Sequence, residues 1–127
     1  MSKTKFVAKW LVRAQEDIEV MELLLKEHGP ANPICFHAQQ AAEKFLKAFL
    51  AYRGKQIRKI HQLDALLMDC ITIDATFIEL KDDAIALTRF YVGTRYPANV
   101  PDFSTRDAAG AIAAAKHIRD VVVAKID

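Results

Sequence analysis

Apolar residues recur every three or four positions along most of the chain, which is the spacing of helices with one buried face. The first such segment runs from about residue 6 to residue 26, and Gly29 and Pro30 follow it as cap and breaker. Its buried stripe consists of Trp10, Ala14, Ile18, Met21 and Leu25, with Val7, Leu11 and Leu24 beside them.

Two more helices follow. Asn32 is predicted to cap a second helix whose first position is Pro33, and the pattern continues to about Tyr52. Glycine at position 54 ends it, and a basic loop comes next. A short third helix is predicted from Gln62 to Cys70.

The remaining sequence predicts a fourth long helix capped by Asp74, a proline-containing loop over residues 93–101, and a last helix beginning at Ser104. Asp107 stands near the positive end of this last, alanine-rich helix. The buried face of the fourth helix is predicted to contain Phe77, Leu80, Ala84, Leu87 and Tyr91. Because no segment alternates with period two, the sequence predicts an all-α fold: a single domain over residues 1–127, built as an antiparallel four-helix up-and-down bundle with one additional short helix.

Composition narrows the class of protein. A chain of 127 residues with 52% apolar and 27% charged residues is typical of a globular domain. Its net charge of +2 gives no overall attraction to nucleic acid, so a basic patch must be local. No signal sequence or membrane span is recognisable, and a cytoplasmic protein with two reduced, buried thiols, Cys35 and Cys70, is expected. Cys35 and His37 lack the further ligands that zinc needs, and neither a metal nor a cofactor is expected.

A row of polar residues follows one face of the second helix. His37, Gln40, Lys44 and Lys47 are spaced by three, four and three residues. Such a row suits a polyanion or the polar wall of a cleft, although a solvated helix face is its ordinary meaning. Glu43 stands four residues before Lys47 and can pair with it.

Asp17 lies beside the buried stripe of the first helix and therefore needs a charged or donor partner. Lys44, Lys47 and Arg89 are the candidates. A structural ion pair is the ordinary interpretation of such a carboxylate.

The loop after the second helix is basic. Arg53, Lys55, Arg58, Lys59 and His61 fall within nine positions. This density of positive charge attracts phosphate, but a basic loop also serves solubility, and the sequence does not separate the two interpretations.

The segment L-T-R-F-Y-V-G-T-R-Y-P, residues 87–97, concentrates arginine and tyrosine where a helix must end. Arginine offers a fork for phosphate and tyrosine a flat surface for a base. Arg89 is predicted on a second helix face, with Arg95 and Tyr96 in the turn beyond it. The alternative is that Arg95 caps the helix carbonyls while Tyr96 packs against the turn.

The sequence resembles the HEPN domain family across nearly its whole length. The resemblance rests on W-L-V-R-A-Q-E-D-I, on F-H-A-Q-Q-A-A-E-K-F-L-K-A-F-L, on His61 followed by Leu63 and Leu66, on R-Y-P and on the alanine-rich last helix. It implies a bundle of four or five helices that commonly forms a homodimer. It also implies a minimal nucleotidyltransferase as the partner in a toxin–antitoxin-like pair. Many members are metal-independent RNases with an arginine followed four to six residues later by a histidine.

None of the four histidines here has that spacing from an arginine, and Arg89 is followed by Arg95 and Tyr96 instead. We therefore predict a non-catalytic module that binds nucleotide or RNA phosphate. The residues predicted to bind the ligand are His37, Gln40, Lys44, Lys47, Arg89, Arg95 and Tyr96, with Asp17 and Glu43 as structural polar residues. An RNase that uses His61 or His37 with Arg89 or Arg95 is one alternative, and a structural partner that docks another chain through Ile78 and Ile85 is the other.

Overall fold

Helices account for the regular structure of the protein, whose computed structural model describes residues 2–93 and 95–126. No strand occurs within those residues. The α-helices are α1 (Lys3–Lys26), α2 (Ala31–Tyr52), α3 (Leu63–Ile73), α4 (Lys81–Thr88) and α5 (Thr105–Lys125), and the 3₁₀ helices are η1 (Ala75–Leu80) and η2 (Pro97–Asn99). None of the described helices is both long and apolar enough to span a membrane.

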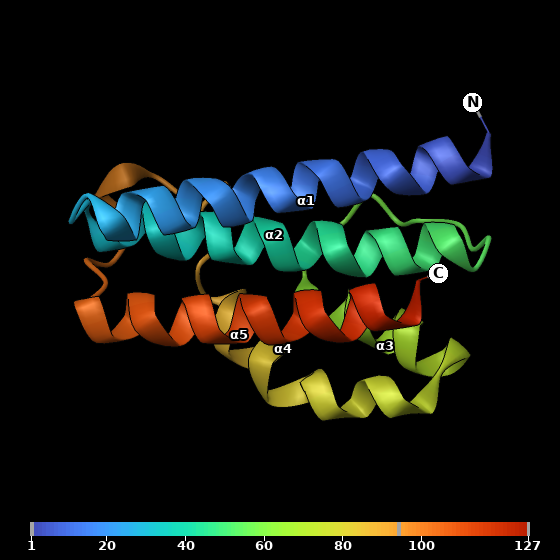
Figure 1. The fold of residues 1–127 in the computed structure, drawn as a ribbon. Helices are drawn as coiled ribbons and strands as arrows, with labels where there is room; N and C mark the ends of the chain where they lie inside the picture. Colours follow the sequence, from blue (N-terminus) through green and yellow to red (C-terminus); the bar gives the residue numbers. More distant parts are fainter. Residues whose placement is uncertain (1, 94, 127) are drawn as a thin grey trace.

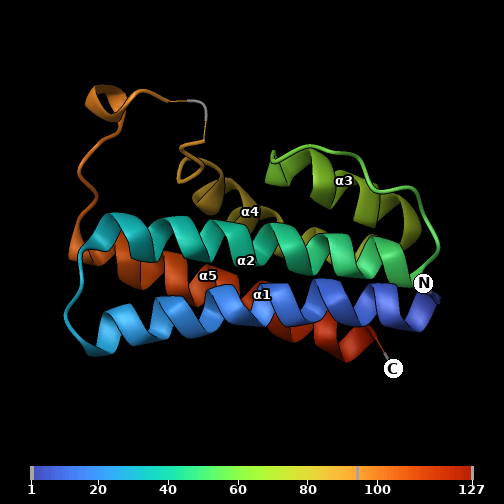
Figure 2. The ribbon, with the colours of Figure 1, turned by 90° about the horizontal axis from the view of Figure 1, so that it is seen from above.

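Helix α2 is the centre of the bundle and contacts all four other α-helices. It lies between α1 on one side and α5 on the other, while α3 and α4 cover a further face (Figures 1 and 2). Chain direction alternates from α1 to α2 and from α4 to α5, with α3 as the additional short helix (Figure 2). The all-α bundle predicted from the sequence is thereby confirmed. Since α2 is covered on most sides, polar residues on it must find partners within the protein.

The N-terminal part of the pattern was predicted with one error. Ser2 caps α1 by accepting a hydrogen bond from the backbone N–H of Lys5 at 3.2 Å. Ala14, Ile18 and Met21 are fully buried, as predicted. Leu25 is 47% exposed, however, while Leu24 packs against the core.

The predicted fourth helix is divided in two. Asp74 caps it as expected, but residues 75–80 form η1, and α4 ends at Thr88. Phe77, Leu80, Ala84 and Leu87 are buried as predicted, so the division leaves the buried face unchanged as far as Leu87. After Thr88 the chain turns, with the N–H of Phe90 donating to the carbonyl of Leu87 at 3.0 Å. Phe90 therefore enters the core with 2% exposure, and the predicted core residue Tyr91 is only half-buried.

Asn32 does not cap α2, which begins at Ala31. Its side-chain amide N–H instead donates to the carbonyl oxygen of Pro101 at 2.8 Å, and its side-chain oxygen accepts from the N–H of Phe103 at 2.8 Å. These two hydrogen bonds fasten the segment before α5 to the start of α2. The ring of Phe103 also meets Phe90 edge-on, with centroids 4.8 Å apart.

Both cysteines are free and buried. Burial raises the pKa of Cys35 to about 11 and that of Cys70 to about 12, so both thiols remain protonated near neutral pH. No group of three or more potential metal ligands occurs among the described residues.

One ion pair between α4 and α5 makes stability depend on pH. His117 Nδ1 lies 2.6 Å from Asp83, and this hydrogen bond, aided by Glu79, raises the pKa of His117 above its usual 6.5. Because the pKa of His117 is higher in the folded state than in the unfolded state, its ion pair contributes its full stabilisation at pH values below the unfolded-state pKa. This stabilisation is lost as the pH rises through the folded-state pKa. We expect His117→Gln to lower Tm more at about pH 5.5 than at about pH 9.

Thermal unfolding followed by circular dichroism at both pH values measures this difference. Lys116→Gln is the matched control, because Lys116 is the preceding residue of α5 and pairs with Glu22 on α1 rather than with Asp83. An effect of His117→Gln that is the same at both pH values would contradict the assignment.

Candidate functional site

The polar row on α2 begins with a cluster shared with α1. Asp17, which is 7% exposed, receives Lys44 Nζ at 2.6 Å and His37 Nδ1 at 2.8 Å. Because an ionised carboxylate only accepts hydrogen bonds, Nδ1 of His37 carries the proton. Of the three candidate partners for Asp17, the structure selects Lys44 and adds His37. The carboxylate of Asp17 therefore neutralises the charge of Lys44. Only about a quarter of each of the His37 and Lys44 side chains is exposed.

A second cluster surrounds Glu43. Its carboxylate receives Lys47 Nζ at 3.0 Å, the pairing predicted from their spacing, and His61 Nδ1 at 3.0 Å from the loop after α2. Glu43 and Lys47 are 4% and 5% exposed. Lys47 also lies 5.6 Å from the ring centroid of Trp10. Lys47 is thus an internal cation, and the prediction that it faces a ligand does not fit its burial.

Gln40 is linked to the Glu43 cluster through Gln39, a residue that the sequence pattern alone did not single out. Gln40 donates to the side-chain oxygen of Gln39 at 2.7 Å, and Gln39 donates to the backbone carbonyl of His61 at 3.2 Å. Gln39 is fully buried. Its position four residues after buried Cys35 and three before buried Ala42 was the available signal, because a polar residue on a buried stripe requires partners.

Tyr91 holds the exposed side of this network. Its ring stacks on His61 with centroids 4.6 Å apart and planes 13° from parallel. Gly93 makes room for this arrangement, since a Cβ at that position would collide with the Tyr91 hydroxyl group. The imidazole of His61 is therefore fixed from two directions, by the Glu43 carboxylate and by an aromatic face.

Arg89 occupies the end of α4 and is tied to α5. Its Nη2 donates to Asp107 at 2.6 Å, and its guanidinium lies 4.7 Å from the ring centroid of Phe90 and 5.5 Å from that of Phe103. Asp107 also accepts from the N–H of Ser104 in a capping box, and this hydrogen bond together with the Arg89 guanidinium lowers the pKa of Asp107. Arg89 remains 55% exposed on its free side.

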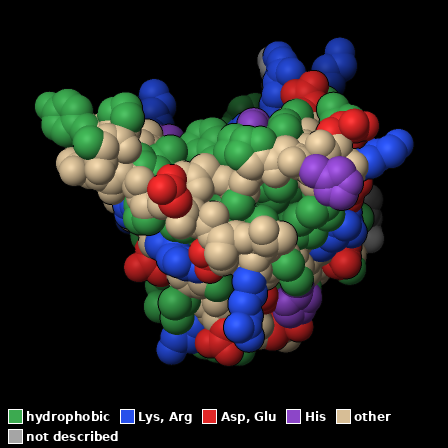
Figure 3. Space-filling model, turned by 90° about the vertical axis from the view of Figure 1, so that its left-hand side faces the viewer, with side chains coloured by type: hydrophobic (Ala, Val, Ile, Leu, Met, Phe, Trp, Pro, Cys, Tyr) green, Lys and Arg blue, Asp and Glu red, His purple; other side chains and the backbone are tan. Residues whose placement is uncertain are grey.

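Arg95 and Tyr96 lie beyond α4 in the segment made of residues 89–93 and 95–103, which we call the arch. Both are exposed, and Tyr96 is exposed to 78%, so it does not pack against the turn. In Figure 2 the arch stands away from the helices beside the N-terminal half of α2. Figure 3 views the molecule from this end, where a largely hydrophobic lobe projects at the upper left. Thr94, within the quoted segment, lies outside the described residues.

The structure thus separates the predicted residues into groups. His37, Gln40 and Lys44 line α2 at the surface, Lys47 and Glu43 lie inside, and the arch presents its own exposed residues. Arg89 lies near the start of α2, since its guanidinium is 5.5 Å from the ring centroid of Phe103, whose N–H donates to Asn32 of that helix. Arg53, Lys55 and Arg58 of the basic loop lie elsewhere, around a separate pocket.

This bundle has a central, mostly apolar helix with a few paired polar residues, a basic loop docked on that helix and an arch after α4. Comparison with known proteins identifies the class of helical protein to which it belongs. A sequence model of the HEPN domain matches residues 7–126, so the chain belongs to the HEPN domain family.

Two solved structures are similar to this chain. One is ST0689, an archaeal HEPN homologue, with 27% identity, a TM-score of 0.77, and coverage of 95% of this chain and 98% of the other. The second is TT1696 from Thermus thermophilus, with 28% identity, a TM-score of 0.79, and coverage of 94% and 98%. No curated protein matches the chain.

Proposed function

We propose that this HEPN protein is a non-catalytic module that binds the phosphate of a nucleotide or RNA on the arch. The observation that carries the proposal is the exposure of Arg95 and Tyr96, next to a half-exposed Arg89. Guanidinium groups bind phosphate oxygens in a forked geometry, and an exposed tyrosine ring can stack on a base. His37, Gln40 and Lys44, partly exposed on α2, are the further polar groups proposed for this ligand.

The absence of catalysis follows from the residue types. Metal-independent RNA cleavage needs a group that exchanges protons near neutral pH, and arginine does not do so. Where RNases of the family place a histidine after the arginine, this chain has Arg95 and Tyr96 after Arg89. These residues can hold a phosphate without accepting a proton from the attacking hydroxyl.

A binding assay tests the proposal. We expect Arg95→Ala to weaken binding of a labelled oligoribonucleotide about tenfold, because a charge-assisted hydrogen bond is lost. Tyr96→Ala is expected to weaken it by a similar factor through lost base stacking. Fluorescence anisotropy measures both, and a set of unlabelled nucleotides serves as competitors. Lys9→Ala removes an exposed lysine from the far half of α1 and should leave the affinity unchanged. Negligible binding by the wild-type protein and the Arg95 variant alike would refute the proposal.

We further propose that the protein forms a homodimer and is the partner of a minimal nucleotidyltransferase in a toxin–antitoxin-like pair. The membership in the family supports this, because HEPN proteins commonly have such partners. An exposed apolar groove between α3 and α4, with Met68, Ile78 and Ile85 each more than half exposed, offers a surface for a protein. Sedimentation of the protein alone and with the nucleotidyltransferase tests both statements. A monomer that does not bind the nucleotidyltransferase would contradict both.

The second candidate is an RNase, favoured by one specific observation. The two imidazoles of His37 and His61 are each oriented by a buried carboxylate on Nδ1. A carboxylate that holds a histidine in this way is a common arrangement in acid–base catalysis. In this version Arg89 or Arg95 would stabilise the phosphorane. Purified protein that leaves tRNA and messenger RNA intact excludes it, whereas cleavage that His61→Ala abolishes would replace the binding proposal.

A further inference from the structure

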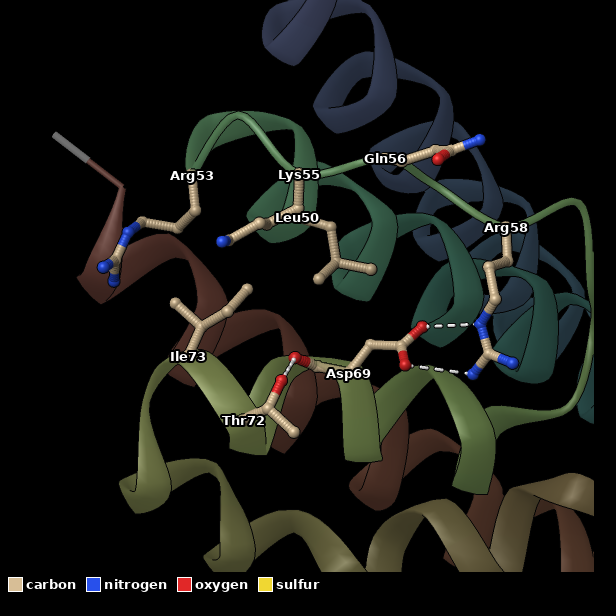
Figure 4. A pocket seen from close by; sticks show the side chains of 8 residues that line it. All are labelled: Leu50, Arg53, Lys55, Gln56, Arg58, Asp69, Thr72 and Ile73. Carbon is tan, nitrogen blue, oxygen red and sulfur yellow. Dashed lines mark hydrogen bonds and ion pairs between the residues drawn. The ribbon is translucent and has the colours of Figure 1, made fainter.

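A second place in the molecule can bind an anion, far along α2 from the arch. A pocket of about 560 Å³ opens between the C-terminal end of α2, the loop that follows it and α3 (Figure 4). This volume falls within the range of about 300–1,000 Å³ that is usual for small-molecule sites. Its lining includes three cationic side chains, Arg53, Lys55 and Arg58, and one carboxylate, Asp69.

One wall of the pocket is a fixed ion pair. Arg58 donates from Nε and Nη2 to the two oxygens of Asp69, at 2.9 and 3.0 Å, and Nη2 also lies 3.2 Å from the carbonyl oxygen of Ala65 (Figure 4). This bidentate geometry joins the basic loop to α3 and cancels the charge of both partners. Each Asp69 oxygen keeps a second lone pair for a donor on a ligand.

The other rim retains its positive charge. Within residues 2–93 and 95–126, neither Arg53 nor Lys55 forms an ion pair with a carboxylate. Gly54 between them has a φ of +69°, which lets the chain turn sharply at the helix end. The N–H of Lys55 donates to the carbonyl of Leu50 at 2.9 Å. The backbone that carries both cations is therefore set before any ligand arrives.

The positive field extends past this rim. Arg53 also borders a neighbouring depression together with Lys3 and Lys125. Lys125 is paired with Asp74 at 2.8 Å, which leaves Lys3 as the added charge on that side. An anion that approaches the end of α2 thus meets several cations within a short distance.

Apolar side chains lie between the cationic rim and the ion-paired wall. Leu50, which is 1% exposed, closes the base of the pocket from α2, and the half-buried Ile73 points into it from α3 (Figure 4). We propose that the pocket binds a small phosphomonoester with an apolar or aromatic body, whose phosphate lies against Arg53 and Lys55 and whose body covers Ile73. Asp69 accepts a hydroxyl or amino group of the same ligand. A single phosphate suffices for this lining, because its third cation, Arg58, is already paired with Asp69.

Titration with adenosine monophosphate, inorganic phosphate and adenosine tests this site, with backbone amide NMR shifts as the readout. We expect adenosine monophosphate to saturate and to shift amides of residues 50–58 and 69–73. Inorganic phosphate should bind more weakly, and adenosine should not bind. Arg53→Gln or Lys55→Gln should each weaken the binding of adenosine monophosphate about tenfold.

Two control variants separate this site from general charge and from the arch. Lys59→Gln removes a cation from the same loop but outside the pocket lining, and it should leave the affinity unchanged. Arg95→Ala should likewise leave the affinity for adenosine monophosphate unchanged. The proposal for this pocket can therefore fail or hold independently of the proposed function of the arch. Equal weakening by Lys59→Gln and Lys55→Gln would overturn the proposal, as would shifts centred on the arch. Tighter binding of an oligoribonucleotide than of adenosine monophosphate at residues 50–58 would also overturn it.

Discussion

Replacement of Glu43 with alanine is expected to destabilise the protein by about 3–5 kcal/mol, the usual effect of leaving one partner of a buried ion pair unpaired. Lys47 would lose its carboxylate partner in a position that is 5% exposed, beside the ring of Trp10. His61 would lose the hydrogen bond that fixes its ring. Urea denaturation measures the free energy of unfolding of the variant and of the wild-type protein.

Two comparisons isolate the cause. Glu16→Ala removes a carboxylate from the exposed pair with Arg13, and we expect a loss of at most about 1 kcal/mol. The double variant Glu43→Leu with Lys47→Met removes both buried charges, and it should recover most of the stability that Glu43→Ala loses. If Glu43→Ala were as mild as Glu16→Ala, the Glu43 cluster would not be the structural core that its burial indicates.

Replacement of Phe77 with alanine is the second large effect, with an expected loss of about 3–5 kcal/mol from the cavity and the lost apolar burial. Phe77 is fully buried, and its ring packs on Phe49 with centroids 4.4 Å apart. It belongs to η1, and 3₁₀ helices have poorer hydrogen bonds than α-helices, so this segment depends on its side-chain packing. The adjacent Ile78 is 58% exposed, and Ile78→Ala should change stability by less than about 1 kcal/mol.

Thermal and urea unfolding of the two variants measure the contrast. Similar losses for Phe77→Ala and Ile78→Ala would show that η1 is not held by the Phe77 contact. The comparison uses neighbouring residues of similar apolar character, so any difference between them reflects burial.

The architecture could be predicted because most of it is local. The stripes of α1, α2 and α5 follow regular helical spacing, and the Asp74 and Ser104 caps are read from single residues. The end of α4 could not be placed in the same way. The helix ends at Thr88, and the turn that follows buries Phe90 in place of the predicted Tyr91. No glycine or proline occurs between Thr88 and Gly93 to mark this end.

The candidate site was predictable in composition and less so in arrangement. Spacing alone pairs Glu43 with Lys47, because four residues bring two side chains onto one helix face. The contact of Glu43 with His61 depends instead on where the basic loop docks, and that is decided by tertiary packing through Gln39. Likewise, the partner of Arg89 lies on α5, eighteen positions away in the sequence. Long-range pairs of this kind follow only once the fold is known.

The anchored ends of the arch have a consequence for affinity. Arg89 is held by Asp107 at one end, and Asn32 clasps residues 101 and 103 at the other. A ligand that meets the arch therefore has less backbone to order, and less conformational entropy is lost when the complex forms. Preorganisation of this kind favours short ligands with few contacts, for which an entropic penalty would otherwise outweigh the gain.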